Sequence, residues 1–388
     1  MKLLLATTVP HTLKHFLTPF ARHFRGQGWQ VDCMAHDASS WFRRGEEFDR
    51  VWDIAWSRNP LDPANLRIAT RQVRAVVEEA GYDIVHVHTP VAAFVTRLAL
   101  RGMRKRGSPR VIYTAHGFHF HRGGNPAKNL AFLSLERLAA RWTDLLVVIN
   151  PEDEAAARRR HLLPPDRIRY IPGIGVDTRA LRPDRFTRSE IREVRRELGL
   201  SERDVLFTMV AGIEPVKRHR DAIRAFAHLN HESAHLALAG TGVLFEAMQA
   251  LASELRVAGR VHFLGFVGNT APLMLASTAT LLPSEREGLS RSVMESLCLG
   301  VPVIGTHARG VRDLLCDGSG RLVEVGDIPA LSRAMRWVIE NRGEARRMGD
   351  RGRAKMAAYD IRNILKLHEE LYGGSPAETE GTYAQAVG

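Results

Sequence analysis

The sequence predicts an α/β protein made of two doubly wound domains, each a parallel sheet with helices on both faces. Short apolar runs alternate with segments of helical spacing along most of the chain, which is typical of parallel sheets. A Pro-, Gly- and Arg-rich stretch at 171–188 interrupts this alternation, which then starts again. The length of 388 residues fits two or three domains.

The apolar runs define the expected strands, and the interruption defines a boundary near residue 175. Strands of the first half are expected at Leu3–Ala6, Val31–Met34, Ile84–His88, Val111–Thr114 and Leu145–Ile149. Strands of the second half are expected at Val205–Val210, Leu236–Ala239, Val261–Leu264, Thr280–Leu282 and Val301–Ile304. We expect domains at 1–175 and 176–355, a crossover helix at 356–372 that packs back on the first domain, and a disordered tail at 373–388. Ligands of two such sheets are expected in a cleft between their carboxyl ends.

The composition narrows the class of partner. A net charge of +12, from 55 Lys and Arg against 43 Asp and Glu, indicates an anionic partner. Cys33, Cys298 and Cys316 lie too far apart for a zinc pattern or a disulfide scaffold. No apolar run approaches the ~18 residues of a spanning helix, and the first apolar segment is too short for a signal peptide. We therefore expect a cytoplasmic protein.

The segment from Ser284 to Glu295 carries the strongest pattern. It follows the expected strand Thr280–Leu282, and we expect a helix to begin near Gly288, where backbone N–H groups suit a phosphate. Glu287 precedes that start and Glu295 lies about two turns inside, roughly 12 Å away. Two carboxylates so placed can accept hydrogen bonds from a sugar and a ribose on either side of a diphosphate. A capped surface helix with a solvated glutamate explains the segment about equally well.

Several segments resemble the retaining glycosyltransferases of family 4. The run Glu287-Gly288-Leu289-Ser290, followed by Glu295, is similar to the donor motif of that family. Other similar segments occur in family order, from about residue 3 to residue 370: Tyr82–Pro90, Tyr113–Phe120, Ile171–Asp177, Ala239–Gly242 and Val261–Phe266. The form of Thr114–Phe120 most resembles the exopolysaccharide and capsular-polysaccharide branch. The resemblance implies the GT-B fold, with two Rossmann-like domains facing a central cleft.

Lys217 is the expected cation of the donor site. It follows the strand Val205–Val210, and a positive charge there can stabilise a leaving diphosphate without a metal. The resemblance implies that Lys217 contacts the donor phosphates. Many family members have an arginine five positions earlier, where this chain has Gly212; Arg218 or Arg220 can compensate. The alternative is a solvated lysine at a helix entry.

The resemblance assigns further positions to the donor. It implies that the Gly240 and Gly242 loop approaches the donor closely, that the backbone near Phe266 faces the base, and that Gly288–Ser290 contacts the sugar and phosphates. The Gly240 loop also matches the start of a dinucleotide-binding motif, but Phe245 stands where the third glycine would be. A tight turn is the simplest alternative.

Histidines gather where strands of the first half end. His86 and His88 alternate on one strand and can share a metal, although no acidic ligand accompanies them and a supporting role in the core is favoured. The resemblance implies that His116 approaches the transferred sugar near the reacting centre. The next loop supplies candidates for the phosphate of the acceptor, or is only a polar surface loop: His119, His121 and Arg122.

Two further segments concern the acceptor and the membrane. The loop Thr7–Lys14 follows the first strand and is expected to line the cleft; it lacks the Gly-Gly pair of many family members, and Lys14 is its best acceptor-side candidate. The stretch from Arg97 to Arg110 holds six cations and no acidic residue. It predicts a basic amphipathic helix and loop that can rest on an anionic membrane, or else a solvated face. Nucleic acid is disfavoured because no recognition motif is present.

Taken together, these patterns predict a retaining glycosyltransferase with His116, Glu287 and Lys217 as catalytic candidates. The resemblance implies transfer of a hexosyl or N-acetylhexosaminyl group from a nucleotide sugar, most simply a UDP-sugar, to a lipid-linked saccharide. The expected place is the inner face of the cytoplasmic membrane, in cell-surface polysaccharide synthesis, with no metal and no cofactor. The alternatives are a nucleotide-sugar epimerase or phosphorylase of similar architecture, a degenerate enzyme acting as a membrane scaffold, and a metal-dependent hydrolase.

Overall fold

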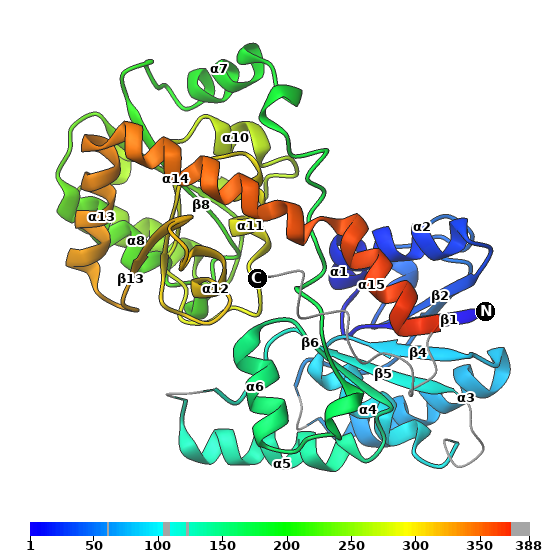
Figure 1. Ribbon diagram of the computed structural model, residues 1–388. Coiled ribbons are helices and arrows are strands. Elements are labelled where there is room, and N and C mark those ends of the chain that lie inside the picture. The colour runs from blue at the N-terminus through cyan, green and yellow to red at the C-terminus, as the bar shows by residue number, and fades with distance from the viewer. Residues whose placement is uncertain (60–61, 104–108, 122–123, 374–388) are drawn as a thin grey trace. The chain divides into compact units, whose positions relative to one another are not determined.

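A computed structural model describes residues 1–59, 62–103, 109–121 and 124–373 (Figure 1). The chain divides into two compact units. The first contains Met1–Ile174 and the chain from Asn363 onward, and the second contains Gly175–Arg362. The tail that the sequence predicts as disordered lies, from residue 374, outside the described residues.

The first unit is built on a seven-stranded parallel sheet with the order β3-β2-β1-β4-β5-β6-β7. Helices on both faces bury the central strands, which explains their continuous apolar runs. The strands are β1 (Lys2–Ala6), β2 (Gln30–Ala35), β3 (Val51–Asp53), β4 (Ile84–Val87), β5 (Arg110–Ala115), β6 (Leu145–Val148) and β7 (Ile168–Tyr170).

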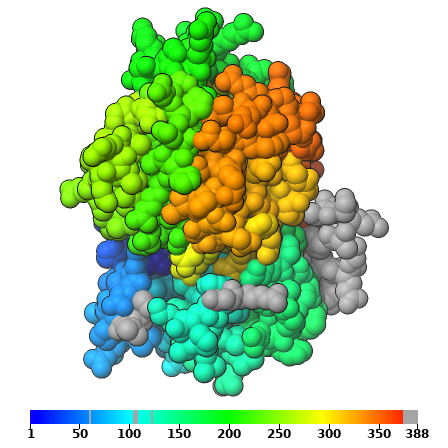
Figure 2. Space-filling view, turned by 90° about the vertical axis from the view of Figure 1, so that its left-hand side faces the viewer, coloured from blue at the N-terminus to red at the C-terminus, as the bar shows by residue number. Residues whose placement is uncertain are grey.

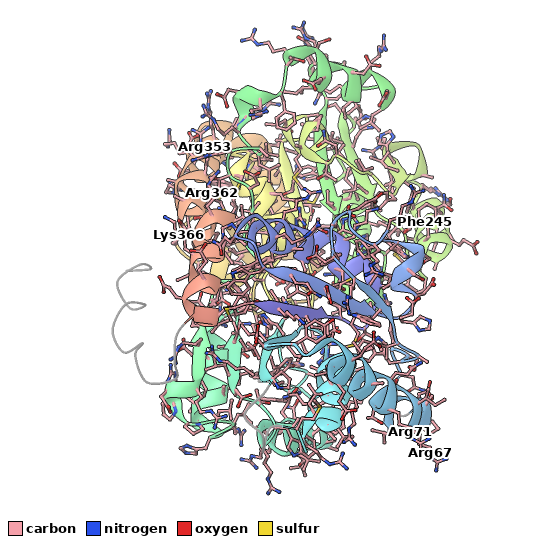
Figure 3. The ribbon with its side chains drawn as sticks, turned by 90° about the vertical axis from the view of Figure 1, so that its right-hand side faces the viewer. Arg67, Arg71, Phe245, Arg353, Arg362 and Lys366 are labelled. Carbon is pink, nitrogen blue, oxygen red and sulfur yellow. The ribbon has the colours of Figure 1, made fainter. Side chains whose placement is uncertain are left out.

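Several helices of the first unit begin with a proline, whose fixed φ suits the first helical position. The longer helices are α2 (Thr18–Gly26), α3 (Thr70–Ala80), α4 (Pro90–Leu100), α5 (Pro126–Ala140), α6 (Pro151–Arg159) and most of α15 (Ile361–Gly373). The short ones are α1 (Pro10–Thr12), the π-helix η1 (Leu13–Leu17), η2 (Ala38–Ser40), the π-helix η3 (Asn65–Ala69) and η5 (Pro165–Arg167). Arg67 and Arg71, about one turn apart, extend into solvent from η3 and α3 (Figure 3).

The last helix, α15, completes the first unit. The Tyr372 hydroxyl lies 2.6 Å from Nδ1 of His86 on β4, and the His368 ring packs edge-on against Phe20, with centroids 4.8 Å apart. The segment expected as a crossover at 356–372 is divided. Its residues up to Arg362 belong to the second unit, and those from Asn363 belong to the first.

The second unit has a six-stranded parallel sheet with the order β10-β9-β8-β11-β12-β13. Its strands are β8 (Val205–Val210), β9 (Ala234–Ala239), β10 (Val261–Gly265), β11 (Ala279–Leu282), β12 (Val303–Thr306) and β13 (Gly320–Val323). Its helices are α7 (Arg188–Glu197), α8 (His219–Leu229), α9 (Phe245–Glu254), α10 (Ala271–Leu275), α11 (Arg291–Cys298), α12 (Arg312–Leu315), α13 (Ile328–Glu340) and α14 (Arg342–Lys355). Short 3₁₀ turns complete it: η6 (Pro183–Arg185), η7 (Pro215–Lys217), η8 (Ala258–Arg260) and η9 (Met356–Tyr359).

The ten expected strands are all present, with ends that differ by no more than two residues. β3, β7 and β13 were not expected. The segment Thr7–Lys14 is a loop only up to Val9, because a helical segment begins at Pro10.

The structure corrects the expected basic face at one position, Arg97, and leaves Arg101 exposed. Arg97 is 2% exposed. Its Nη2 donates to Glu136 at 3.1 Å, and its guanidinium lies 4.2 Å from the ring centroid of Tyr113. Helix α4 is buried on most of its surface, so this arginine is held inside by a carboxylate and an aromatic face. Arg104, Lys105 and Arg106 lie outside the described residues.

Candidate functional site

The second unit joins two of the predicted site residues directly. Nζ of Lys217 lies 2.7 Å from Oε1 and 2.9 Å from Oε2 of Glu287. The Ser284 hydroxyl donates to Oε1 of Glu287 at 2.7 Å. Lys217 follows β8 and Glu287 follows β11, which are neighbours in the sheet, so the carboxyl ends of adjacent strands bring the pair together. The side chains are 25% and 11% exposed, so the ammonium group remains accessible to an anion.

The loop that carries Glu287 is tied to the segment after β12. The Glu287 amide donates to the Arg309 carbonyl at 3.2 Å, and Nε of Arg309 donates back to the Glu287 carbonyl at 3.4 Å. Gly310 has φ +78°, and a Cβ there would lie 2.4 Å from the Gly288 carbonyl oxygen. The glycine therefore permits the close approach of the two loops.

Helix α11 begins at Arg291 rather than near Gly288, which corrects the expected helix start. Ser290 is its N-cap, with an extended backbone and a hydroxyl that accepts from the Val293 amide at 3.4 Å. The backbone bonds of Glu287 to the loop after β12 keep Gly288 and Leu289 out of the helix. Glu295 accepts from Nε of Arg291 at 2.8 Å and its side chain is 16% exposed. The two predicted glutamates thus have different cationic partners.

The neighbours of Lys217 differ in their availability for an anion. Arg218 adopts a left-handed backbone with φ +56° and its Nε donates to the buried Asp221, whose charge it offsets. Arg220 is exposed. A Cβ on Gly212 would have its nearest neighbour, the Thr241 carbonyl oxygen, at 3.7 Å, so this position has room for a side chain.

The loop after β9 needs glycine at two positions, because backbone atoms of the loop after β8 lie too close for a Cβ. A Cβ on Gly240 would lie 2.0 Å from the Ala211 carbonyl oxygen, and one on Gly242 would lie 2.4 Å from that of Ile213. These glycines therefore allow the loops after β8 and β9 to touch. On the next strand, Phe266 follows β10 and is 68% exposed.

The first unit gathers uncharged histidines at the end of its sheet. Nδ1 of His86 contacts Tyr372 at 2.6 Å and its Nε2 contacts the Thr114 hydroxyl at 2.7 Å. Nδ1 of His88 lies 3.1 Å from Nε2 of His116. Burial lowers the pKa of His86 and of His88 well below the usual histidine value, and neighbouring histidines lower both further.

His116 follows β5 and is half-buried as a residue. Burial, and then the positive charge that His368 could carry, lower the pKa of His116 to about 4. The ring is therefore neutral at pH 7, and it can accept or donate a hydrogen bond without adding charge.

The loop after His116 holds the other acceptor-side candidates. The His119 ring lies 5.1 Å from that of Phe132. The backbone of His121 is held at both its amide and its carbonyl by Asn129, at 3.2 and 2.9 Å. Arg122 lies outside the described residues.

Trp41 is a candidate that the sequence analysis missed. It follows η2 and is 42% exposed, and Nζ of Lys14 lies 5.7 Å from its ring centroid. A tryptophan in the polar run Ser39-Ser40-Trp41 after a predicted strand is the signal that could have indicated it.

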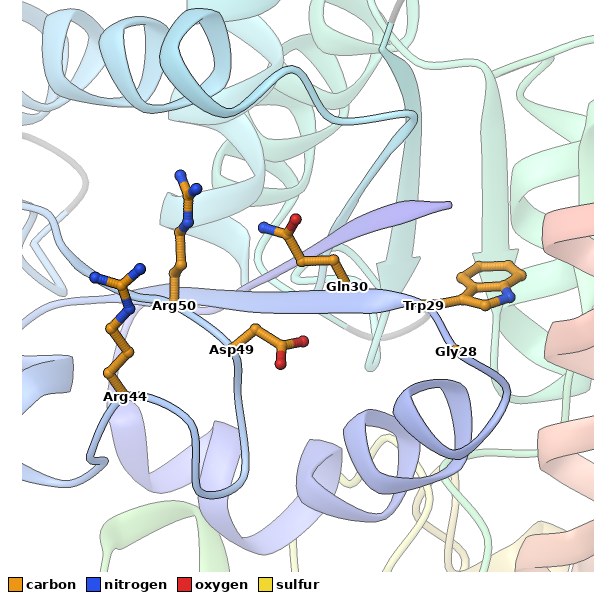
Figure 4. A pocket seen from close by; sticks show the side chains of 6 residues that line it. All are labelled: Gly28, Trp29, Gln30, Arg44, Asp49 and Arg50. Carbon is orange, nitrogen blue, oxygen red and sulfur yellow. The ribbon is translucent and has the colours of Figure 1, made fainter.

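Metal-binding clusters, surface depressions and membrane-spanning helices are the other features that could indicate a site. Within the described chain, no set of three or more His, Cys, Asp or Glu side chains has a metal-binding arrangement. A depression of about 410 Å³ lies at the amino end of β2 (Figure 4), away from the carboxyl edge. Asp49, in its lining, already pairs with Arg25 at 3.1 Å. None of the described helices is both long and apolar enough to cross a bilayer.

Comparison with known families divides the chain into two matched regions. The family described as "Glycosyl transferase 4-like domain" matches residues 15–173. The family described as "Glycosyl transferases group 1" matches residues 190–355.

Related proteins and solved structures match between 69% and 96% of the chain. A Bacillus subtilis (strain 168) protein described as the glycosyltransferase EpsD is 34% identical over 375 residues, or 96% of each chain. An Escherichia coli relative, "UDP-Gal:alpha-D-GlcNAc-diphosphoundecaprenol alpha-1,3-galactosyltransferase", is 26% identical over 69% of each chain. The structure of Anabaena HepE with UDP covers 96% of this chain and 100% of its own, with TM-score 0.78 and 19% identity. The lipopolysaccharide glycosyltransferase WaaG matches with TM-score 0.76 and 16% identity, over 96% of this chain and 100% of its own. These structures share the GT-B fold with this chain.

Proposed function

Because the chain belongs to the group 1 (family 4) glycosyltransferases, a retaining family, we propose that it transfers a hexosyl or N-acetylhexosaminyl group from a UDP-sugar to a lipid-linked saccharide. Cell-surface polysaccharide synthesis is the proposed setting. The lipopolysaccharide biosynthesis named for WaaG supports the setting, and the diphosphoundecaprenol substrate named for the Escherichia coli relative supports the acceptor. The UDP-bound HepE structure supports the nucleotide.

The Lys217–Glu287 pair is the observation that carries this proposal. A diphosphate that approaches Lys217 competes with Glu287 for the same ammonium group. Once Lys217 binds phosphate oxygens, the carboxylate of Glu287 is released to accept hydrogen bonds from donor sugar hydroxyls. One existing ion pair therefore supplies both contacts, and the cation stabilises negative charge as the diphosphate leaves.

The remaining roles follow from position. The non-helical amides of Gly288–Ser290 bind the sugar and phosphates, Glu295 holds the ribose, and the segment around the exposed Phe266 faces the base. Gly240 acts indirectly: it lets the loop after β9 touch the loop after β8, and this contact positions the segment around Gly212. On the first unit, neutral His116 hydrogen-bonds the reacting sugar.

The proposed reaction is a front-face displacement without a covalent enzyme intermediate. The bond between the sugar C1 and the diphosphate oxygen breaks, and a bond forms between C1 and the acceptor hydroxyl oxygen on the same face. The leaving diphosphate takes the hydroxyl proton. Lys217 supplies the positive charge that this departure requires, so we propose that no metal takes part.

Helix α5 offers the best surface for a membrane contact. It exposes Leu130, Leu135 and Leu138 at 64%, 43% and 39%, beside exposed Lys128 and Arg137. The helix reaches the surface in the lower part of Figure 2, in teal. Exposed leucines flanked by cations suit an anionic lipid surface, and we propose that this helix, rather than the Arg97 stretch, makes the peripheral contact.

The test of the proposed function is a thermal-shift panel of nucleotides and nucleotide sugars with EDTA present. A ligand that binds only the folded protein raises the midpoint by mass action. We expect stabilisation by UDP and by one UDP-sugar. Stabilisation by no nucleotide would contradict the donor site and favour a scaffold, and a requirement for added metal would contradict the role of Lys217.

A further inference from the structure

Trp41 presents its ring to solvent from a turn that is held firmly. The Ser39 amide and hydroxyl donate to Asp53 at 2.9 and 2.6 Å. The Ser40 hydroxyl donates to the carbonyl and the carboxylate of Asp37, each at 2.8 Å. These bonds fix the turn that carries the 42% exposed Trp41, whose indole offers an apolar face to a ligand.

Polar groups of a neighbouring element surround this ring. His11, Lys14 and His15 share one face of the segment α1–η1, at spacings of three and four residues. Nζ of Lys14 lies 5.7 Å from the Trp41 centroid, and the His11 ring lies 6.2 Å away, nearly perpendicular. The rings of His11 and His15 are 4.3 Å apart. Burial, and then the charge of Arg58, lower the pKa of His11.

The sheet order gives the spacing between the strands that precede Trp41 and His116. Trp41 follows β2, Lys14 follows β1 and His116 follows β5, and β4 lies between β1 and β5. At about 4.8 Å per strand, β2 and β5 are separated by roughly 14 Å. We therefore assign the sugar on Trp41 to a different position from the sugar that contacts His116.

We propose that Trp41 and Lys14 form a second acceptor subsite, which binds a sugar ring on the indole and an adjoining phosphate on the ammonium group. The proposal rests on the proposed function, because it extends the acceptor of that reaction. The axial C–H groups of a pyranose give it an apolar face that matches an indole. The contact between Lys14 and Trp41 is exposed and leaves the other donors of the ammonium free for phosphate oxygens. The acceptor class is thus a saccharide joined to a phosphate or diphosphate, whose phosphate-linked sugar is held away from His116.

The experiment uses saturation-transfer NMR on the full-length protein with a stated probe, N-acetylglucosamine linked through a diphosphate to an undecyl chain. We expect transfer to the pyranose protons in the wild type, about tenfold weaker binding in Trp41→Ala, and recovery in Trp41→Phe. Lys14→Met should remove the preference for this probe over the undecyl glycoside that lacks the diphosphate. Ile68→Ala, which alters another exposed apolar side chain of this unit, is the control and should bind as the wild type does.

Equal binding by Trp41→Ala and the wild type, or no transfer in the wild type, would overturn the subsite. UDP thermal shifts of the same samples report the donor site separately. A sample that responds to UDP while Trp41→Ala binds the probe normally refutes only the subsite, whereas absence of a UDP response refutes the proposed function. If Trp41→Ala instead lowers sedimentation with phosphatidylglycerol vesicles and leaves probe binding intact, the ring contacts lipid and the proposal is wrong.

Discussion

The two sheets end in different chemistry. At the carboxyl edge of the second unit, Lys217 and Glu287 are oppositely charged, partly exposed and paired with each other. At the corresponding edge of the first unit, His88 and His116 share a hydrogen bond and are neutral at pH 7 because burial lowers the pKa of each. A leaving diphosphate needs a cation, whereas a sugar hydroxyl needs only a hydrogen-bond partner. Under the proposed function, we infer that the second unit supplies charge to the leaving diphosphate and that the first unit positions the sugar.

The largest expected effect comes from removing the charge on the second unit. Lys217→Ala should lower kcat/KM by about 10²-fold or more, because one stabilising contact to the leaving group is lost. Glu287→Gln should also lower kcat/KM, since the amide holds neither the lysine nor the sugar as the carboxylate does. Steady-state kinetics with the UDP-sugar identified by thermal shift provide the measurement.

Arg224→Ala is the matched control for loss of a cation, because Arg224 is an exposed residue of α8. It should leave kcat/KM unchanged. If Lys217→Ala retained near-wild-type activity, the second unit could not be the part that supplies charge.

A steric change in the loop beneath Glu287 should have the next largest effect. Gly310→Ala places a Cβ 2.4 Å from the Gly288 carbonyl oxygen, so the donor segment must move and kcat/KM should fall at least tenfold. Gly318→Ala introduces similar backbone strain, at φ +83°, but its Cβ lies 3.6 Å from the nearest atom. Both variants should lose about 1–2 kcal/mol of stability from the left-handed backbone, and only Gly310→Ala should lose activity. Equal activities of the two variants would show that the loop contact does not position the site.

The neutral edge of the first unit should become unstable in mild acid. Burial lowers the pKa of His116 and of His368 to about 4, and lowers that of His86 and His88 well below 6.5. Between pH 6.5 and about 4 the unfolded chain therefore binds more protons than the folded one. The free energy of unfolding should fall as the pH drops through this window, by up to about 1.4 kcal/mol per pH unit for each histidine.

Hydrogen exchange between pH 7.5 and 5 would test whether the first unit opens before the second. In the second unit, among the described residues, only His219 has its pKa lowered as far, also to about 4. The stability of the second unit should therefore fall less steeply with decreasing pH than that of the first. This range avoids most carboxylate titration. Equal slopes in the two units would contradict a special role for the histidine group.

The membrane surface gives a smaller, separable effect. Leu130→Glu should reduce sedimentation with anionic vesicles several-fold, since it places a negative charge on the apolar face of α5. Leu66→Glu is the control, because Leu66 is 51% exposed and lies beside Arg67 and near Arg71. Activity on a soluble acceptor should not change in either variant. Equal losses of vesicle binding would exclude α5 as the specific contact.

The smallest expected effect is tighter binding of UDP by a variant with an added cation in the second unit. Gly212→Arg introduces the cation that many family members have at this position. A Cβ there would lie 3.7 Å from its nearest neighbour, the Thr241 carbonyl oxygen. We expect UDP to bind a few-fold more tightly, measured by thermal shift. Gly259→Arg, at a site with nothing within 4 Å of a Cβ, controls for added charge. An unchanged UDP affinity in a folded Gly212→Arg variant would mean that the phosphates do not reach this position.

The sequence predicted the central strands because they are continuous apolar runs buried on both faces. It did not predict β3, β7 or β13, which lie at sheet edges. These strands are three or four residues long, and most of their residues are half-buried, so they lack that signal.

Contacts between residues far apart in the sequence could not be predicted. Lys217 and Glu287 were each singled out, but their ion pair joins residues 70 positions apart, and no local pattern encodes it. Arg97 looked exposed in a cationic run, yet Glu136 and Tyr113 draw it inside. The helix starts later than expected because Arg309 occupies both backbone groups of Glu287: its carbonyl accepts from the Glu287 amide, and its Nε donates to the Glu287 carbonyl.

The hydrogen bond between His86 and Tyr372 has a consequence for synthesis on the ribosome. β4 is translated early, whereas Tyr372 emerges only after the whole second unit has been made. Because His86 and Tyr372 are 286 residues apart, this interval is roughly 15–60 s at typical elongation rates of about 5–20 residues per second. During that time the nascent first unit lacks its last helix, so the surface around His86 and Phe20 that this helix buries is uncovered. The second unit, which is contiguous in sequence, can fold first, so the amino-terminal half of this protein is completed last.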